Sequence, residues 1–417
     1  MKTRIKSSEL KNKFLAIGQI TMTSIKAYHM LKKDGIEISM FFDKDFRLIS
    51  QRYDNTAIFP WSNFYGAYII LTVPSRYKEL RNFLVEFCGY DDEHIIYLED
   101  IEFMCDESDI ENDLDWEWIK DYTANPSDMY IAYKTSLFKN KYKEDVFSPD
   151  LAVDINNKCT LNCKYCYAQM PYYLNSEKRN YDISNIIANL DKLIDKVDYI
   201  PYLWILGGEP LLHPELDKLI DYISSEKVVN KVVHADILTN GTLLLSEQAV
   251  AALKRNPLYW RVSVSPYGKH SGKQHELFSQ LSEAGIPYYS RYMVYWQKFG
   301  LVTAPKTLDE DEIREKCEMC VCRNMHLSEK YIYRCPVLAH FVELKRVPFD
   351  ARNSFDCTEN YTKEMLREYF NGVCPGMAYC NGNHQTYISE TEADKFAGDF
   401  VPVAEQAEGV LTYKRYE

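Results

Sequence analysis

Three cysteines, Cys159, Cys163 and Cys166, lie in one short run of the chain with the spacing CxxxCxxC. The run directly follows an apolar stretch, 151–155, that is typical of a buried strand. Because a compact loop can point all three sulfurs inward, the thiolates can hold three irons of a [4Fe-4S] cube and leave the fourth iron open. The alternative is a zinc site, since CxxC pairs are common zinc ligands.

A Gly-Gly-Glu-Pro turn follows the next apolar stretch, 202–206, with Gly207, Gly208 and Glu209 as its first three residues. Glycines let the backbone approach a ligand closely, and a carboxylate can receive an ammonium group. A zinc fold needs neither this turn nor a set of three ligands plus an open one. The combination therefore favours the iron-sulfur interpretation. Tyr165 adds an aromatic side chain between the last two cysteines.

Together these motifs resemble the CxxxCxΦC and GGE motifs of the radical S-adenosylmethionine (radical SAM) enzymes. The resemblance implies that the open iron chelates the amino and carboxylate groups of S-adenosylmethionine, and that the segment around Tyr165 meets its adenine. It also implies a low-potential electron donor such as flavodoxin or ferredoxin. Reductive cleavage of the cofactor then yields a 5′-deoxyadenosyl radical, which abstracts hydrogen from the substrate.

Two later strand ends resemble further parts of the same family. Thr239-Asn240-Gly241 resembles its TNG turn, whose polar groups lie near the cofactor, although an ordinary Asn-Gly turn is the alternative. Ser263 begins a Ser-Val-Ser-Pro-Tyr-Gly run where the peptide-modifying branch has Ser-x-Asp-Gly, and the missing Asp weakens the likeness to that branch. The residues predicted to bind the cofactor are Tyr165, Gly207, Gly208, Glu209, Asn240 and Ser263.

A second group of cysteines lies in the C-terminal part. The unit from Cys322 to Cys335 resembles the start of a SPASM or twitch extension, which carries auxiliary iron-sulfur clusters, although Lys330 stands where the family usually has glycine. One complete [4Fe-4S] cluster needs four thiolates, so the count favours one auxiliary cluster. The predicted ligands are Cys320 or Cys322, with Cys335, Cys374 and Cys380. Cys317 is a further candidate, and Cys357 is predicted to be a bystander or a thiol donor at the radical stage.

Length and charge limit the classes of protein. The 417 residues suffice for two or three domains, and the formal net charge of −12 argues against a nucleic-acid partner. We expect neither secretion nor a membrane span, because no apolar region follows the basic start and no run approaches 18 apolar residues. The prediction is a cytoplasmic protein with reduced cysteines, of which Cys88 and Cys105 are expected to be buried and free.

The elements that position these motifs alternate between strand and helix. In residues 1–100 this rhythm predicts a small Rossmann-like α/β domain, with strands at 13–18, 35–43, 67–73 and 94–98 and helices at 21–33 and 75–87. Only Gly18 stands where the dinucleotide motif G-x-G-x-x-G needs three glycines, so a nicotinamide site is disfavoured. Asp43 is expected to be a solvated acid at the end of its strand.

Residues 101–147 are predicted to form a helical linker. From residue 148 to 305 we expect strands at 151–156, 202–206, 232–239, 260–265 and 287–295, with helices near 182–197, 214–226, 246–254 and 273–284. Such alternation predicts parallel strands whose carboxyl ends gather the motifs. The resemblance implies a partial (β/α)6 TIM-like barrel. The overall prediction is an α/β protein that ends in a SPASM/twitch-like domain at 306–417.

The sequence constrains the substrate least. The favoured hypothesis is hydrogen abstraction from a small-molecule or sugar-linked substrate, and the alternative is a ribosomal peptide maturase. Peptide maturases often carry a winged-helix domain that binds the leader peptide, whereas the first hundred residues here read as α/β. A non-catalytic metal-binding protein is the third hypothesis. Tyr267 and Tyr292, near strand ends, are candidates for shaping the substrate pocket.

Overall fold

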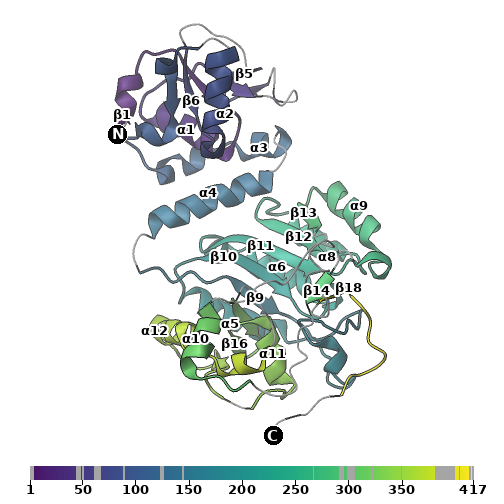
Figure 1. The fold of residues 1–417 in the computed structure, drawn as a ribbon. Helices are drawn as coiled ribbons and strands as arrows, with labels where there is room; N and C mark the ends of the chain where they lie inside the picture. Colours follow the sequence, from purple (N-terminus) through teal and green to yellow (C-terminus); the bar gives the residue numbers. More distant parts are fainter. Residues whose placement is uncertain are drawn as a thin grey trace. The chain divides into compact units, whose positions relative to one another are not determined.

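A computed structural model gives the fold of the chain (Figure 1). It describes residues 4–43, 48, 51–60, 67–87, 90–122, 126–142, 145–265, 267–290, 295–297, 306–318, 320, 324–348, 350–380, 400–402, 404–412 and 415. Cys88, Tyr292 and Cys322 lie outside these residues. The chain forms two compact units, 1–143 and 144–417, and each is described by itself.

The first unit is built on a six-stranded sheet with the strand order β4-β5-β3-β2-β6-β7. All neighbours are parallel except β4 and β5. Counted without β4, this is the strand order 3-2-1-4-5 of doubly wound folds. The strands are β2 (Leu15–Gly18), β3 (Met40–Asp43), β4 (Arg52–Tyr53), β5 (Thr56–Pro60), β6 (Tyr68–Leu71) and β7 (Ile95–Tyr97). A separate parallel pair joins β1 (Ile5–Lys6) to β8 (Ile101–Glu102).

The helices of this unit include residues that the sequence predicts as a linker. They are α1 (Met22–Lys33), α2 (Tyr77–Asn82), α3 (Trp116–Tyr122) and α4 (Pro126–Lys141). Ile110, Leu114, Ile119 and Tyr133 are buried in the same core as α1 and β2, so the stretch 101–142 belongs to the first unit. The prediction of a solvated Asp43 is wrong. Its carboxylate is buried and accepts a hydrogen bond from the backbone N–H of Ile20 at 2.6 Å, because the turn after β2 needs an acceptor there.

The second unit is built on an eight-stranded sheet with the order β13-β12-β11-β10-β9-β15-β16-β17. Neighbouring strands are parallel from β13 through β9 to β15, whereas β16 is antiparallel to both of its neighbours, β15 and β17. The mixed α/β fold with parallel strands is therefore confirmed. The strands are β9 (Leu151–Asp154), β10 (Ile200–Leu206), β11 (Val232–Thr239), β12 (Trp260–Val264), β13 (Tyr288–Ser290), β15 (Met325–Ser328), β16 (Tyr331–Tyr333) and β17 (Phe355–Asp356).

Four helices of this unit lie close to their predicted positions, namely α5 (Ile183–Ile194), α6 (Leu216–Ile223), α8 (Glu247–Leu253) and α9 (Gln274–Ala284). The unit also contains four helices that were not predicted, namely α7 (Glu226–Val229), α10 (Glu310–Glu318), α11 (Pro336–Glu343) and α12 (Lys363–Asn371). The predicted strand 287–295 is shorter, since β13 ends at Ser290 and Tyr295 opens β14 (Tyr295–Gln297), which pairs with β18 (Phe400–Pro402). Among the described residues, no helix is both long and apolar enough to cross a bilayer.

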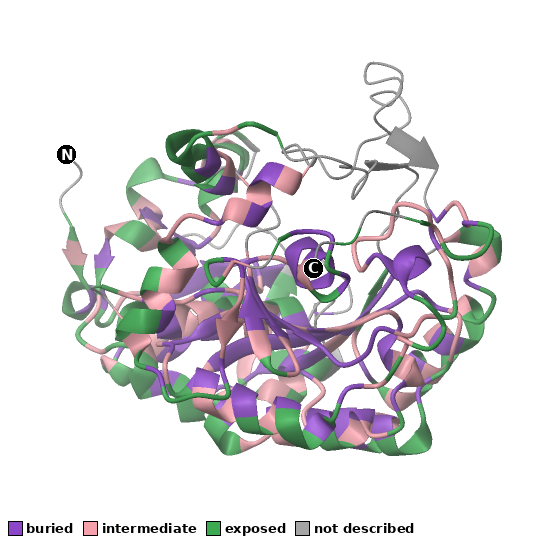
Figure 2. Ribbon diagram, turned by 90° about the horizontal axis from the view of Figure 1, so that it is seen from below, coloured by how far each residue is buried: buried purple, intermediate pink, exposed green. Residues whose placement is uncertain are grey.

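The two faces of the large sheet differ in chemistry. One face is apolar and fully buried, with Val153, Ile205, Ile237, Val262 and Leu327 in successive strands. The alternate positions are polar or aromatic, because side chains alternate across a strand. They include Asp154, Trp204, Asp236, Arg261 and His326. Figure 2 shows the buried strands and the exposed outer sides of the surrounding helices. The polar face is thus the one that can present chemistry.

Candidate functional site

The CxxxCxxC loop follows the carboxyl end of β9, and its three sulfurs lie in a buried environment that supplies hydrogen-bond donors. Burial and the nearby Cys166 raise the pKa of the Cys159 thiol to about 12, and the same causes raise the pKa of Cys163. Thiolates at these positions therefore need a compensating positive charge, which iron provides. The loop residues fit a cluster held by Cys159, Cys163 and Cys166.

Amide donors aimed at sulfur support this fit. Asn240 Nδ2 lies 3.5 Å from Cys159 Sγ, and the backbone N–H of Leu161 donates to the same sulfur at 3.4 Å. Gln406 Nε2 donates to Cys163 Sγ at 3.2 Å. Hydrogen bonds of this kind favour the thiolate and are typical of iron-sulfur ligands. The predicted residue Asn240 is therefore close to the cysteine loop in space.

The two glycines of the Gly-Gly-Glu turn are required by contact with the chain itself. A Cβ on Gly208 would lie 2.1 Å from the carbonyl oxygen of Lys158, and one on Gly207 would lie 2.4 Å from Asn156 Oδ1. Gly207 also has a φ of +151°, which disfavours other residues. The backbone N–H of Glu209 donates to Lys158 O at 2.7 Å. The turn thus holds the backbone that leads into Cys159.

Glu209 joins this turn to the TNG turn after β11. Its fully buried carboxylate accepts hydrogen bonds from Thr239 Oγ1 and the backbone N–H of Asn240, both at 2.8 Å, and from Leu211 N at 3.1 Å. Burial raises the pKa of Glu209 to about 7. In this structure the carboxylate positions the two turns, and its binding of the cofactor ammonium stays a prediction.

Ser263 is buried on the polar face of β12, beside an ion pair. Its hydroxyl donates to Asp236 Oδ2 at 2.7 Å, and Arg261 donates to the same oxygen through Nε at 3.1 Å and Nη2 at 3.0 Å. Asp236 therefore orients both side chains. The sequence predicted Ser263 but gave no signal for Asp236, whose partners lie on another strand.

Tyr165, predicted to meet the cofactor, and Tyr267, a candidate for shaping the substrate pocket, both lie close to the cysteine loop. Tyr165 and Tyr267 pack against an apolar cluster that Cys163 and Ala404 form. Both rings are partly buried. The C-terminal segment that contains Ala404 thus contributes to this site, which the sequence did not predict.

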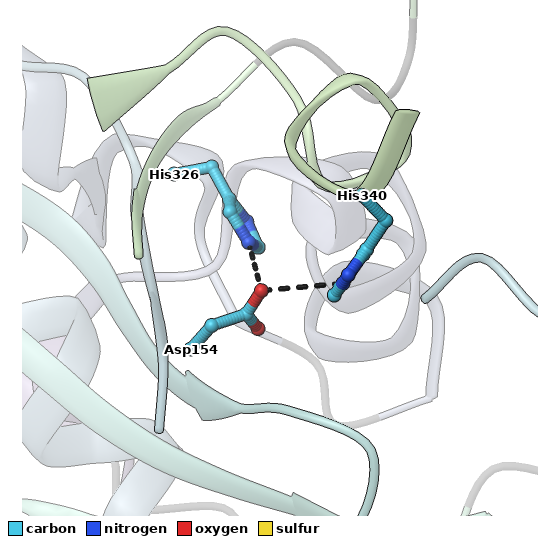
Figure 3. A group of neighbouring side chains, drawn as sticks. All are labelled: Asp154, His326 and His340. Atoms are coloured by element: carbon cyan, nitrogen blue, oxygen red, sulfur yellow. Dashed lines mark hydrogen bonds and ion pairs between the residues drawn. The ribbon is translucent and has the colours of Figure 1, made fainter. Parts of the chain in front are cut away.

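A buried group of one carboxylate and two imidazoles lies at the carboxyl end of β9 (Figure 3). Asp154 Oδ2 is 2.6 Å from His326 Nε2 and 3.3 Å from His340 Nε2, and all three side chains are at most 2% exposed. The shorter separation is that of a direct hydrogen bond. Asp154, His326 and His340 come from β9, β15 and α11, so no local sequence pattern could reveal them.

Further polar groups extend this triad. Tyr173 Oη donates to Glu343 at 2.6 Å and lies 2.8 Å from His340 Nδ1. Burial alone would lower the pKa of His340, but its contacts with Asp154 and Glu343 raise it to about 9. Burial would raise the pKa of Asp154, but the imidazoles hold it well below its usual value. His340 is therefore a buried imidazolium paired with Asp154.

The second cysteine group surrounds a cavity of about 240 Å³. Five cysteines line it: Cys317, Cys320, Cys335, Cys374 and Cys380. A hydrogen bond with Cys374 lowers the pKa of Cys317 to about 7, and burial raises that of Cys335. Cys357 lies elsewhere, and its thiol donates to Lys330 O at 2.9 Å. The described residues bring four predicted ligands together and add Cys317.

One [4Fe-4S] cluster needs four thiolates, and the cysteines that line the cavity can supply them without Cys322. Cys322 lies outside the described residues. The Lys316 ammonium donates to the carbonyl of Cys380 at 2.5 Å, and Arg314 and Arg334 also line the cavity. These cations compensate the negative charge that several thiolates would bring. In the first unit, Cys105 is free but only partly buried.

Comparison with known proteins finds a family model that matches the part of the chain with the first cysteine group. Residues 153–268 match the sequence model of the Radical SAM superfamily. An uncharacterized protein of Methanocaldococcus jannaschii is 33% identical over 95 residues, which cover 22% of this chain and 31% of that protein. A GTP 3′,8-cyclase of Clostridium acetobutylicum is 34% identical over 118 residues, covering 28% of this chain and 33% of the cyclase. The matches thus span about a third of the length of these curated relatives.

A structural likeness covers more of the chain. The crystal structure of BtrN in complex with AdoMet and 2-DOIA covers 58% of this chain and 98% of its own, at 16% identity and a TM-score of 0.37. The predicted radical SAM resemblance is confirmed by the family model for residues 153–268.

Proposed function

We propose, from the premise that residues 153–268 are a radical SAM segment, that this chain uses S-adenosylmethionine to abstract hydrogen from a polar, sugar-linked or other small-molecule substrate. The segment marks the chain as an enzyme and implies a [4Fe-4S] cluster and S-adenosylmethionine as cofactors. The observation that carries the proposal is the surroundings of the cysteine loop. Asn240 and Gln406, from distant parts of the chain, each direct an amide N–H at a cysteine sulfur of the loop.

Bound to Cys159, Cys163 and Cys166, the cluster would supply the electron that cleaves S-adenosylmethionine to a 5′-deoxyadenosyl radical. The chain contributes position and exclusion of water. The Gly207-Gly208 turn holds the backbone leading into Cys159, and Glu209 fixes the TNG turn that places Asn240. Tyr165 packs beside Cys163 and shields the loop. A low-potential donor such as flavodoxin or ferredoxin is the proposed electron source.

The polar sheet face supports the choice of substrate class. The rings of Tyr202 and Trp204 lie nearly parallel, at an interplanar angle of 6° and a centroid distance of 5.7 Å. Asp236 and Arg261 lie on the same face of neighbouring strands. Aromatic surfaces beside convergent hydrogen-bonding groups suit a small polar ligand with ring faces, such as a sugar. We propose that this face of a partial barrel contacts the substrate.

The second cavity supports an auxiliary [4Fe-4S] cluster in a SPASM/twitch-like domain. Cys335, Cys374 and Cys380 are the proposed ligands, and Cys317 or Cys320 is the fourth. A cluster held by four thiolates has no open iron, so its proposed role is to accept an electron from the substrate radical. This role makes the overall reaction an oxidation of the substrate.

The test is anaerobic reconstitution of the full chain with iron and sulfide, followed by S-adenosylmethionine and dithionite. We expect 5′-deoxyadenosine from the wild type and none above background from Cys163→Ala. Cys105→Ala, which changes a free thiol of the first unit, is the matched control and should keep the activity. Cleavage that persists in Cys163→Ala would overturn the proposal. Deuterium transfer from labelled sugars or from peptides into 5′-deoxyadenosine distinguishes the two substrate classes.

A further inference from the structure

The C-terminal segment 404–412 lies along the CxxxCxxC loop, although more than 200 residues separate them in the sequence (Figure 1). Backbone hydrogen bonds run from Lys164 N to Glu405 O and from Ala407 N to Asn162 O, both at 2.7 Å. Cys163 and Gln406 face each other as an antiparallel bridge. The segment is therefore paired with the loop as a short piece of sheet.

Further contacts extend the pairing in both directions. The Asn162 side chain donates to the carbonyls of Ala407 at 3.1 Å and Gly409 at 2.8 Å. Leu411 N donates to Pro171 O at 2.8 Å, beyond the last cysteine of the loop. Because the bonds of Lys164, Ala407 and Leu411 join backbone groups on both partners, they set the register of the segment on the loop. The side chain of Gln406 is placed at the central cysteine.

The amide of Gln406 has only one orientation that satisfies its neighbours. Its Oε1 accepts a hydrogen bond from the backbone N–H of Asn162 at 2.7 Å, which can only donate. Its Nε2 must then be the donor to Ala404 O at 2.6 Å and to Cys163 Sγ at 3.2 Å. The bond to sulfur is thus a true N–H···S hydrogen bond.

The segment also controls the exposure of this sulfur. Cys163 is 5% exposed and Ala404 is 0% exposed, and the two residues form one apolar cluster. Donors to cluster sulfurs and exclusion of water both tune the reduction potential of an iron-sulfur site. Reduction of a cluster adds electron density to its sulfur ligands, and an N–H donor stabilises that density. The donor therefore favours the reduced state of the cluster.

We propose that Gln406 is a positioning residue of the radical cluster, and that the segment 404–412 raises the reduction potential of the cluster and shields it from solvent. The inference rests on the proposed function, because it assumes a cluster at Cys163. It assigns to the C-terminal segment a role in the electron transfer that starts the reaction.

The experiment is an anaerobic redox titration of the reconstituted full chain, followed by EPR. The signal of the cluster with the open iron is identified by its change when S-adenosylmethionine is added. Gln406→Leu keeps the size of the side chain and removes the donor, and Gln406→Glu also adds a negative charge beside the sulfur. We expect the midpoint potential to fall in Gln406→Leu and to fall further in Gln406→Glu. Loss of iron in air should be several-fold faster in both.

Glu405→Gln is the matched control, because the Glu405 carboxylate forms an exposed ion pair with Lys164 and Glu405 pairs with the loop through its backbone. This variant should keep the wild-type potential. An iron-loaded Gln406→Leu protein with unchanged potential and air stability would overturn the inference. Should both Gln406 variants lose iron, an unchanged unfolding midpoint of the chain supports the inference, and a collapsed midpoint overturns it. A wild-type chain without any cluster would instead overturn the proposed function.

Discussion

Asp154 Oδ2 and His340 Nε2 lie 3.3 Å apart in the interior of the second unit and connect its two cysteine groups. Asp154 ends β9, directly before the loop of Cys159, and His340 lies in α11, which begins directly after Cys335. A movement of α11 relative to β9 would separate this buried pair. The ion pair therefore joins the strand that precedes the first cysteine loop to the helix that follows Cys335.

The pH dependence of stability should reveal this pair. The pKa of His340 is raised from 6.5 to about 9 in the folded state, so its contribution is complete below about pH 6.5 and is lost as the pH rises through 9. Between these pH values the free energy of unfolding of the wild type should fall by on the order of 3 kcal/mol relative to that of His340→Gln, since one pKa unit corresponds to about 1.4 kcal/mol. Urea unfolding at pH 6 to 10 measures the difference.

His234→Gln is the control for that series, because burial lowers the pKa of His234 to about 3 and it stays neutral throughout. Its effect on stability should not change with pH in this range. A pH profile of His340→Gln parallel to that of the wild type would contradict the assignment of a buried imidazolium.

A double-mutant cycle tests the coupling of Asp154 and His340. Asp154→Asn leaves the imidazolium without its carboxylate and should cost about 3–5 kcal/mol, as removal of one partner of a buried pair does. Adding His340→Gln removes the unpaired positive charge, so the double variant should recover part of the lost free energy of unfolding. Strictly additive free energies of unfolding would show that the two side chains act independently.

Gly208→Ala should disrupt the radical cluster site. The new Cβ would lie 2.1 Å from the carbonyl oxygen of Lys158, so the backbone leading into Cys159 must move. We expect Gly208→Ala to lose about four irons per chain, and the cleavage of S-adenosylmethionine with them. Gly272→Ala is the matched control, since among the described residues no atom beyond its two chain neighbours lies within 4 Å of its Cβ position. Normal iron content in Gly208→Ala would show that the turn adapts.

The second cavity predicts the iron stoichiometry. Wild type should bind about eight irons, given four per cluster. Cys374→Ala and Cys380→Ala each remove a thiol that lines the cavity and should lower the count towards four. Cys357→Ala is the control, because that thiol donates to a backbone carbonyl outside the cavity. Iron analysis after anaerobic reconstitution gives the result, and equal loss in Cys357→Ala would contradict the ligand set.

Local pattern was sufficient for the parallel strands and the helices between them. β11 spans the predicted 232–239, and β10 and α9 lie within two residues of their predicted bounds. Apolar runs that alternate with amphipathic segments encode such elements directly. The short strands β4 and β5 were missed, because a strand of two to five residues carries little periodic signal.

The sequence by itself determined the chemistry of the first cysteine loop, because the spacing of Cys159, Cys163 and Cys166 and the Gly-Gly-Glu turn are local features. Only the tertiary structure decided which distant groups surround that loop. Glu209 reaches the turn at Asn240, Gln406 reaches Cys163, and Asp154 meets two histidines from other elements. The reason is physical: hydrogen bonds and ion pairs between residues more than 20 positions apart depend on strand order and register, which no local spacing specifies.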